Sequence, residues 1–319
     1  MDWIFIRRSC DGAQNAPQFV ISEGEPIQSS EMNQISIVEC PRDAWQGIHE
    51  FIPTAQKVVY LKQLLQCGFH TIDAGSFVSS RAMPQMADAY ELFGALEEAK
   101  SKSPTKLLAI VANEGGAKRA AKYDFIDAWG YPLSVSDLFQ QRNSRKDIPG
   151  AIEDLKRVKS VASDHNVELV VYLSMAFGNP YGEAYDVDMV LERLHQAVQC
   201  GADVVSLSDT TGQGTIEKVG QLCKLMNMES TLPWGAHMHS IYGEAAAKAQ
   251  EAMKHGCRRI DTALRGFGGC PFASDALIGN MPTEKVLSVI TAEGYDCTVN
   301  PLHLESSYNS ALKLFGHYL

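Results

Sequence analysis

The sequence lacks any apolar run long enough to cross a membrane, and its cysteines lack the spacing of a zinc or redox motif. No run of 18 apolar residues occurs in the 319-residue chain, so we expect no membrane span. Eight cysteines are scattered, and no two stand in a Cys-x-x-Cys arrangement, which argues against a zinc knuckle or a thioredoxin-like site. Such cysteines are typical of reduced, mostly buried thiols in an intracellular protein.

Positive charge is also scarce, and no secretory leader is recognisable. The formal net charge is −10, which disfavours nucleic acid as a partner. Arg7 and Arg8 stand among acidic residues without an apolar segment, so we expect a cytoplasmic protein. The 45% hydrophobic and 21% charged residues argue against disorder and predict a chain able to bury a large core.

Beyond about residue 32, short apolar runs alternate with longer amphipathic segments. The predicted strands are Ile35–Cys40, Thr71–Ala74, Leu107–Ala112, Phe125–Trp129, Leu169–Met175, Val204–Leu207, Trp234–His239 and Arg259–Ala263. The predicted helices are Thr54–Cys67, Pro84–Lys100, Gly116–Tyr123, Pro149–His165, Val187–Cys200, Thr215–Met228, Tyr242–His255 and Pro282–Ala292, with one more short helix beyond Asn300. Glycines at 68, 201 and 256 stand where helix C-caps belong.

Strict alternation of strands and helices indicates an α/β protein with a parallel sheet. Eight repeats in roughly 260 residues favour a closed (β/α)8 TIM barrel over an open sheet. We therefore predict residues 33–319 as a single TIM-barrel catalytic domain. Residues 1–32 show no periodicity, and we predict a short irregular N-terminal extension there.

Polar side chains gather where the predicted strands end, which is where a barrel of this kind carries its site. They are Arg42, Asp43, Asp73, Asp209, His237 and His239. Residues i and i+2 on a strand share a face, so His237 and His239 should converge. They form either a hydrogen-bonded structural pair or, with Asp43, a ligand set. Two imidazoles with oxygen ligands suit a divalent metal with exchangeable positions.

Two loops at the same end carry further candidates. Gly266–Pro271 is glycine-rich, and its Cys270 is either a proton donor on a lid or an inert small residue in a turn. Gln141–Lys146 is a basic cluster in an acidic protein. Arg142, Arg145 and Lys146 could bind phosphate, although a solvated basic loop is the commoner explanation.

Six sequence blocks resemble the 3-hydroxy-3-methylglutaryl-CoA lyases of the DRE-TIM metallolyase superfamily. They extend from about residue 35 to 295. The blocks are Val38–Gln46 with Ile52-Pro53-Thr54, Gly75–Ser79 with Pro84–Asp88, Ser208–Gly212, His237–His239, Gly268–Pro271 and Gly279-Asn280. Their order matches that of the family.

The resemblance implies roles for individual residues. Asp43, His237, His239 and Asn280 would hold Mg²⁺ or Mn²⁺. Arg42 would stabilise the thioester enolate, Asp73 stands where the family usually has Glu, and Asp209 matches an active-site Asp. Cys270 matches the cysteine of the catalytic loop. Gln46 and the basic residues Arg142, Arg145 and Lys146 are our candidates for contacting the CoA ester.

The reaction implied is cleavage of 3-hydroxy-3-methylglutaryl-CoA, or a closely related 3-hydroxyacyl-CoA, to acetyl-CoA and acetoacetate. A base removes the proton of the tertiary hydroxyl, and either His237 or Asp209 could serve. The resemblance also implies leucine degradation and ketone-body metabolism. Partners would be an acyl-CoA substrate and a second copy in a homodimer, without nucleic acid or membrane.

The chain departs from the family pattern at several positions. Cys40 and Ala44 replace glycines, and Ser240 replaces the Asp that commonly follows the second His. Asp73 is one methylene shorter than Glu, about 1.5 Å less reach. The segment from Cys270 to Asn280 is one residue longer.

Two alternatives keep the barrel but change its activity. A Claisen-type synthase, such as an isopropylmalate or homocitrate synthase, would form the carbon–carbon bond instead. The Gly-Gly-Cys-Pro loop favours the lyase over it and over a 4-hydroxy-2-oxo-acid aldolase. The second alternative is a non-catalytic barrel that only binds CoA esters. The retention of Asp43 and both histidines argues against it.

Overall fold

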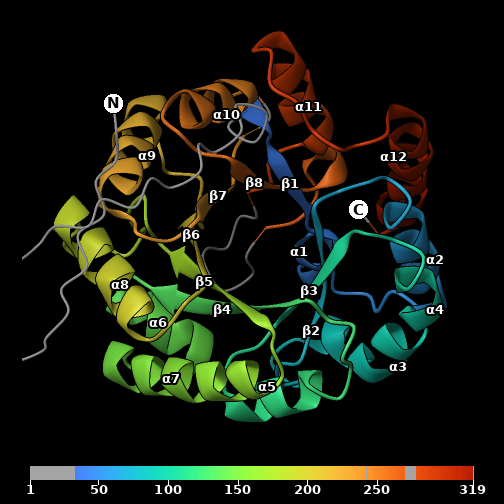
Figure 1. The fold of residues 1–319 in the computed structure, drawn as a ribbon, viewed down its shortest axis with the longest axis horizontal. Coiled ribbons are helices and arrows are strands. Elements are labelled where there is room, and N and C mark those ends of the chain that lie inside the picture. The colour runs from blue at the N-terminus through green and yellow to red at the C-terminus, as the bar shows by residue number, and fades with distance from the viewer. Residues whose placement is uncertain (1–32, 242, 270–277, 319) are drawn as a thin grey trace, which may run out of the picture. The chain divides into compact units, whose positions relative to one another are not determined.

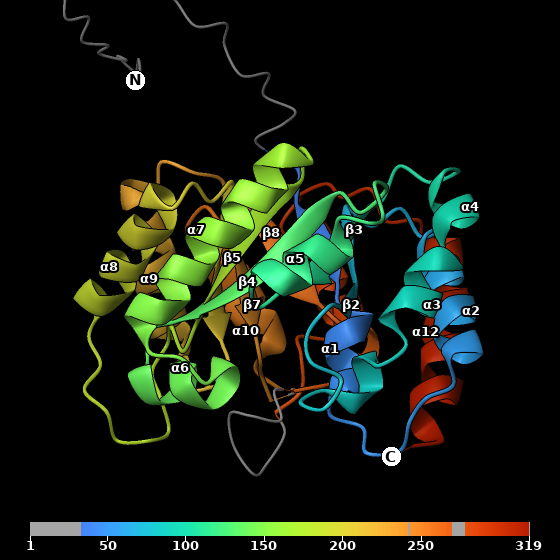
Figure 2. The same ribbon diagram turned by 90° about the horizontal axis from the view of Figure 1, so that it is seen from below.

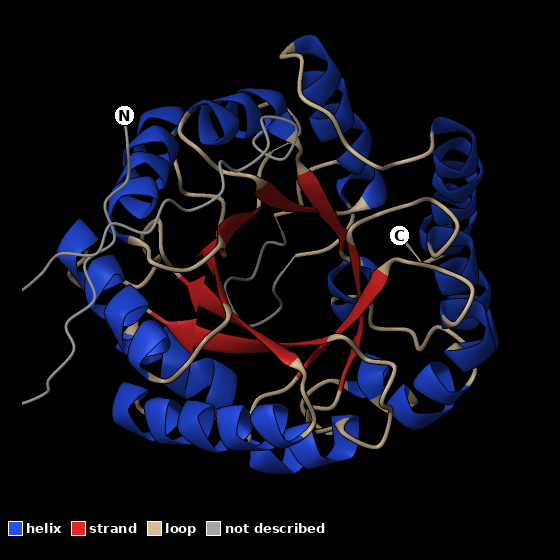
Figure 3. Cartoon of the chain, viewed as in Figure 1, coloured by secondary structure: helices blue, strands red, loops and turns tan. Residues whose placement is uncertain are grey.

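The eight strands form one closed parallel barrel, in the order β1 to β8 around the ring. This computed structural model describes residues 33–241, 243–269 and 278–318. Figures 1 and 3 look into the barrel and show the strands surrounded by helices. The barrel belongs to a compact unit that begins at Ile35. The predicted (β/α)8 architecture is confirmed.

The element bounds follow the predicted alternation closely. The strands are β1 Ser36–Glu39, β2 Thr71–Ser76, β3 Lys106–Ile110, β4 Ala128–Ser134, β5 Glu168–Ser174, β6 Val204–Asp209, β7 Trp234–Met238 and β8 Arg259–Thr262. The α-helices are α1 Pro41–Gln46, α2 Thr54–Leu64, α3 Ala89–Gly94, α4 Glu97–Lys100, α5 Glu114–Ala120, α6 Asp137–Ser144, α7 Ile148–Asp164, α8 Val187–Gln199, α9 Ile216–Glu229, α10 Ala245–Lys254, α11 Thr283–Ala292 and α12 Pro301–Gly316.

Three predictions of element bounds were wrong. The strand predicted at Phe125–Trp129 is β4, Ala128–Ser134, which contains glycine and proline instead of a continuous apolar run. Position 130 favours glycine because the Cβ of any other residue would clash with Ile110 Cδ1 at 2.5 Å. The helix predicted at Pro84–Lys100 is divided into a short 3-10 turn, α3 and α4. The C-terminal helix α12 has 16 residues and is not short.

Strand alternation separates two apolar layers. Most buried apolar side chains lie between the sheet and the helices. A smaller cluster of Leu108, Ala128, Val170, Tyr172 and Val204 comes from β3 to β6. These positions have the same parity along each strand as the residues that line the cavity described below, so they fill the barrel interior. The side-chain parity of each strand therefore decides which residues can reach a site in the barrel mouth.

The carboxyl ends of the strands carry two short helices that were not predicted. Helix α1 begins at Pro41, immediately after β1, so Arg42 and Asp43 lie in its first turn. Helix α6 follows β4, and the Ser136 side chain caps it by accepting from the Phe139 N–H. Figure 2 shows α1 and α6 at the same end of the barrel. Both helices therefore present residues to the barrel mouth.

Candidate active site and metal centre

A cavity of about 320 Å³ opens at the carboxyl ends of the strands. Seven of the predicted site residues line it: Arg42, Asp43, Gln46, Arg145, Lys146, His237 and His239. Asp73 and Asn280 do not line it, but their side chains bond to Arg42 and Asp43, respectively. Cys270 lies outside the described residues. Most of the predicted set is therefore brought together in one place.

Arg42 is held by three side chains. Its Nε donates to Asp73 Oδ2 at 3.0 Å and its Nη2 donates to the same oxygen at 2.5 Å. Its Nη1 donates to Asp43 at 3.1 Å and to Gln46 at 2.7 Å. These bonds use four of the five guanidinium hydrogens. One Nη2 hydrogen has no partner among the described residues and is available to a ligand in the cavity.

A β-bulge in β2 lets both Asp73 and Ser76 point toward the barrel interior, where Asp73 pairs with Arg42. The register of β2 against β3 shifts between Asp73 and Gly75. Without the shift, Asp73 and Ser76 would point to opposite sides of the sheet, because strand side chains alternate. With it, Asp73 reaches Arg42 and Ser76 lines the cavity. The bulge therefore adds an inward-facing polar residue to β2.

Four side chains converge beside Arg42. The Nε2 atoms of His237 and His239 lie 3.2 Å apart, and His239 Nε2 lies 3.6 Å from Asp43 Oδ2. Asn280 Nδ2 donates to that same oxygen at 2.7 Å. A backbone bridge between His239 and Asn280 aligns the end of β7 with the segment that follows β8. The arrangement joins residues from three separate parts of the chain.

The charges in this group are set mainly by burial and by Arg42. Burial opposes ionisation of Asp43, but Arg42 and the two imidazoles outweigh it and lower the pKa of Asp43 to about 2. Burial lowers the pKa of His239 to about 4. Burial also disfavours the imidazolium of His237, but its contact with Asp261 prevails and raises its pKa. A carboxylate and a neutral imidazole at His239 are therefore present near neutral pH.

This donor set fits a divalent metal ion. One ligand atom from each of Asp43, His237 and His239 lies within 4.8 Å of the others, and all three residues are buried. Asn280 Oδ1 is buried and accepts no hydrogen bond from the described residues. Buried acceptors without donors are costly, and a cation would satisfy them. Two imidazoles with carboxylate and amide oxygens are ligands suited to such an ion.

The glycine-rich segment approaches these ligands closely. A Cβ on Gly268 would lie 2.5 Å from Asn280 Nδ2 and 2.7 Å from the Asp43 carbonyl oxygen. The φ angle of Gly268 is +112°, which side chains rarely tolerate. The glycine-rich pattern predicted a loop that approaches its neighbours closely, and the contacts at Gly268 agree with that prediction.

Asp209 does not face the cavity. Its neighbours Ser208 and Thr210 line the cavity, so alternation turns Asp209 outward. Its carboxylate accepts from the backbone N–H groups of Gln213 and Gly214, each at 2.9 Å. Lys248, whose side chain is fully buried, lies 3.8 Å away. Asp209 therefore anchors the turn after β6, and the structure does not place it among the cavity residues.

The basic cluster is divided between the cavity and the surface. Arg145 has a φ of 58° and ends α6, and with Lys146 it lines the cavity. Lys146 also pairs with Asp154. Arg142 instead packs over the Tyr181 ring, with its guanidinium carbon 4.5 Å from the ring centroid. The structure thus separates Arg142 from the other two predicted CoA contacts.

Sequence reasoning missed three buried charged residues near the site: Lys248, Arg259 and Asp261. Arg259 and Asp261 stand two residues apart on β8, so they share its inner face. Arg and Asp are rarely buried unless paired, so two opposite charges at i and i+2 of a predicted buried strand could have drawn attention to both. Lys248 lies on α10 in a helical pattern, where a lysine usually indicates a solvated face.

No helix among the described residues is long and apolar enough to cross a membrane.

Comparison with known proteins gives consistent matches over most of the chain. Residues 34–309 match the family model described as HMGL-like. A Rattus norvegicus protein, "3-hydroxy-3-methylglutaryl-CoA lyase, cytoplasmic", is 32% identical over 274 residues, covering 83% of this chain and 77% of the relative. A Pseudomonas aeruginosa "3-hydroxy-3-isohexenylglutaryl-CoA/hydroxy-methylglutaryl-CoA lyase" is 30% identical, covering 81% and 85%. The crystal structure of hydroxymethylglutaryl-CoA lyase from Pseudomonas aeruginosa superposes with a TM-score of 0.81 at 28% identity, covering 89% and 94%.

Proposed function

Because the chain belongs to the HMGL-like family, we propose that it is an oxo-acid lyase that cleaves 3-hydroxy-3-methylglutaryl-CoA, or a closely related 3-hydroxyacyl-CoA, to acetyl-CoA and acetoacetate. The observation that carries the proposal is the meeting of Asp43, His237 and His239 beside Arg42 in one cavity. The names of the curated relatives support the substrate.

Asp43, His237, His239 and Asn280 would hold the metal, which we propose to be Mg²⁺ or Mn²⁺. When bound, the ion supplies Lewis-acid polarisation and lowers the pKa of a coordinated hydroxyl. Gln46, the last residue of α1, supports this set because its amide donates to Asp43 while its oxygen accepts from Arg42. Gln46 therefore orients both residues in addition to lining the cavity.

Arg42 would bind the thioester oxygen. Its remaining Nη2 hydrogen is directed to a charge that develops during cleavage, when the acetyl-CoA enolate forms. A fixed donor of this kind is typically worth roughly 3 kcal/mol in the transition state. Asp73 keeps the guanidinium in place by accepting hydrogen bonds from its Nε and Nη2. The guanidinium needs little reorganisation during cleavage because these bonds already fix its orientation.

The proton of the substrate hydroxyl needs a base. Of the two candidates from the sequence, only His237 lines the cavity, and Asp209 is committed to backbone N–H groups. His237 cannot accept a proton at Nε2 while that atom holds a metal. We assign its Nε2 to the metal, because Nε2 converges with His239, and its Nδ1 faces Asp261. Neither of the two candidates is therefore proposed as the base. Cys270, which the resemblance makes the proton donor to the enolate carbon, remains a proposal outside the described residues.

Arg145 and Lys146 at the rim of the cavity would bind the CoA phosphates, since guanidinium and ammonium groups favour phosphate. The name of the rat relative supports a cytoplasmic location. We also propose a homodimer, which light scattering on the purified protein would test. Roles in leucine degradation and ketone-body metabolism follow from the acetoacetate product and are part of the same proposal.

The test is a coupled assay for acetyl-CoA release from 3-hydroxy-3-methylglutaryl-CoA, with Mg²⁺, with Mn²⁺ and with chelator. We expect cleavage that chelator abolishes and added metal restores. Asp43→Ala should eliminate it, and Cys270→Ala should reduce it sharply. A folded, metal-loaded protein that leaves this ester intact would contradict the substrate assignment. A panel of other 3-hydroxyacyl-CoA esters, and acetyl-CoA with 2-oxo acids, would then separate a related lyase from a Claisen-type synthase.

A further inference from the structure

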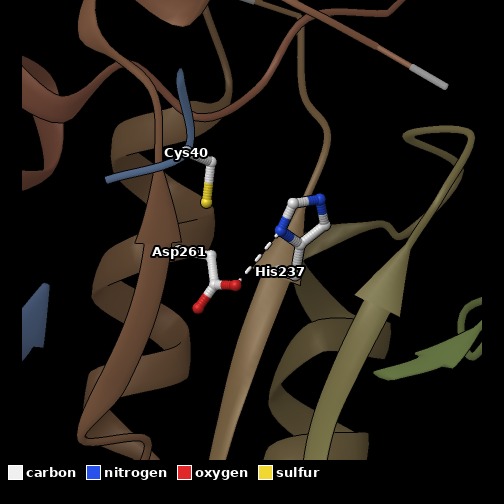
Figure 4. A group of neighbouring side chains, drawn as sticks. All are labelled: Cys40, His237 and Asp261. Atoms are coloured by element: carbon white, nitrogen blue, oxygen red, sulfur yellow. Dashed lines mark hydrogen bonds and ion pairs between the residues drawn. The ribbon is translucent and has the colours of Figure 1, made fainter. Parts of the chain in front are cut away.

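We infer that Asp261 is a positioning residue that fixes the ring and the tautomer of His237. Asp261 Oδ2 lies 3.3 Å from His237 Nδ1 (Figure 4). The opposite ring nitrogen, Nε2, faces His239 at 3.2 Å. Asp261 thus contacts Nδ1 of an imidazole whose Nε2 belongs to the proposed metal centre. The inference rests on the metal site of the proposed function.

The contact between His237 and Asp261 follows from the register of β7 against β8. His237 of β7 and Asp261 of β8 are register partners, so their side chains leave neighbouring strands on the same face. Asp261 is 1% exposed, which removes competition from bulk water. The ring of His237 therefore has a fixed acceptor behind Nδ1.

Asp261 is itself held as a carboxylate. Arg259 Nη1 donates to Asp261 Oδ1 at 2.9 Å, and Arg259 Nη2 donates to the Tyr172 hydroxyl at 3.3 Å. The Tyr172 ring meets the His237 ring edge-on, with centroids 5.8 Å apart and an interplanar angle of 84°. His237, Asp261, Arg259 and Tyr172 thus form a ring of contacts in the barrel interior. Each member restrains the next, so the imidazole has little freedom to turn.

A carboxylate can only accept hydrogen bonds. The His237–Asp261 contact therefore requires the hydrogen of His237 on Nδ1. This leaves the Nε2 lone pair facing Asp43 and His239, as a metal ligand requires. Partners of this kind behind ligating histidines typically change metal affinity by about 10- to 100-fold when they are removed.

Cys40 belongs to the same neighbourhood but does not change the assignment. Its Sγ lies within 4.8 Å of ligand atoms on His237 and Asp261 (Figure 4), a trio that could in principle hold a cation. However, the Arg259 guanidinium already pairs with Asp261, and positive charge there opposes a second cation. The Cys40 thiol instead donates to the Val38 carbonyl oxygen at 3.7 Å. Within the trio, Asp261 and not Cys40 is therefore the hydrogen-bond partner of His237.

Mn²⁺ binding to the metal-free, full-length protein tests the inference, with free Mn²⁺ followed by electron paramagnetic resonance. Asp261→Asn keeps the shape of the side chain but removes the charge. We expect its dissociation constant for Mn²⁺ to rise about 10- to 100-fold. Glu39→Gln is the matched control, since Glu39 is another buried carboxyl group of the same sheet and its hydrogen bonds are to Thr262, Leu264 and Thr283. Its affinity should stay within about twofold of the wild type.

The tautomer is tested independently by ¹⁵N nuclear magnetic resonance of histidine-labelled wild-type protein, with His237 assigned from its loss in His237→Gln. A protonated Nδ1 supports the inference, and an unprotonated Nδ1 overturns it. Equal Mn²⁺ affinity in Asp261→Asn and the wild type also overturns it. If Asp261→Asn does not fold, the wild-type spectrum decides. A wild type that binds no Mn²⁺ contradicts the proposed function, while the spectrum still tests the contact with Asp261.

Discussion

Arg42 donates through Nε and Nη2 to Asp73 Oδ2, at 3.0 and 2.5 Å, and its Nε also donates to Asp73 Oδ1 at 3.2 Å. The shorter side chain at position 73 therefore still reaches the guanidinium; the Asp73 carboxylate is buried and the Arg42 side chain is partly exposed. Burial opposes the charge on Asp73, and its pKa is raised despite the guanidinium beside it. Arg42 carries its charge at every working pH. The Arg42 guanidinium is thus a hydrogen-bond donor whose orientation depends on the Asp73 carboxylate.

Replacing Arg42 should test that geometry. Lysine keeps the charge but loses the planar fork that joins Asp73, Asp43 and Gln46. We expect Arg42→Lys to lower kcat by about 100- to 1,000-fold, and Asp73→Asn to lower it less, because the amide still accepts one hydrogen bond. The acetyl-CoA release assay measures both. Asp203→Asn serves as the control, because Asp203 stands at the amino end of β6, where it pairs with Lys159. Near-normal turnover in Arg42→Lys would refute the assigned role.

The basic residues of α6 and its C-terminus allow a paired comparison. Arg145 lines the cavity, whereas Arg142 packs over Tyr181. Arg145→Ala should therefore raise KM for the acyl-CoA by about tenfold with little change in kcat, because one charge-assisted phosphate contact is lost. Arg142→Ala should leave both constants unchanged. Steady-state kinetics at fixed ionic strength measure this. Equal effects of the two substitutions would mean that CoA is bound elsewhere.

Glu39 should make stability depend on pH. Burial raises its pKa to about 8, although hydrogen bonds from Thr283 and Leu264 oppose the shift. The unfolded chain has the ordinary value of 4.5. Folded protein therefore binds more protons between these values. The contribution of Glu39 is fully present below about pH 4.5 and is lost as pH rises toward 8.

Glu39→Gln should remove this dependence, because the amide mimics the protonated acid and does not titrate. Between pH 5 and 8 we expect the wild type to lose up to about 1.4 kcal/mol per pH unit relative to the variant. Denaturant unfolding of both proteins at several pH values, without metal, measures the difference. Parallel stability curves for the two proteins would show that Glu39 titrates normally.

Lys248 should stabilise the turn after β6. Its fully buried ammonium group lies 3.8 Å from Asp209 and 3.3 Å from Glu244, and it donates to the Gly212 carbonyl oxygen at 3.5 Å. Lys248→Met leaves the buried Asp209 charge with only backbone donors. We expect a loss of about 3 kcal/mol in stability and a fall in Tm of several degrees, measured by differential scanning fluorimetry.

The double variant Lys248→Met with Asp209→Asn provides the control for that prediction. It removes the uncompensated charge, so its Tm should recover part of the loss. A double variant that is destabilised by the sum of the two single changes would show that Lys248 and Asp209 do not interact.

Much of the architecture could be predicted from local patterns in the sequence alone. Alternating strand and helix patterns predicted the barrel, and the period of two along a strand predicted that His237 and His239 share a face. Glycines 68, 201 and 256 were expected at helix ends, and all three have positive φ angles. Gly201 and Gly256 directly follow the C-caps of α8 and α10, whereas Gly68 lies three residues beyond the C-cap of α2. Such features depend on neighbours within a few residues, so a linear pattern reveals them.

The tertiary structure decided how those strands meet. The His237–Asp261 contact depends on the register of β7 against β8, and the inward turn of Asp73 depends on a bulge against β3. Asp209 stands in a block that resembles active-site sequence, yet alternation after β6 turns its carboxylate toward backbone N–H groups and Lys248. Register and bulges are set by packing between strands distant in sequence, and no local pattern encodes them.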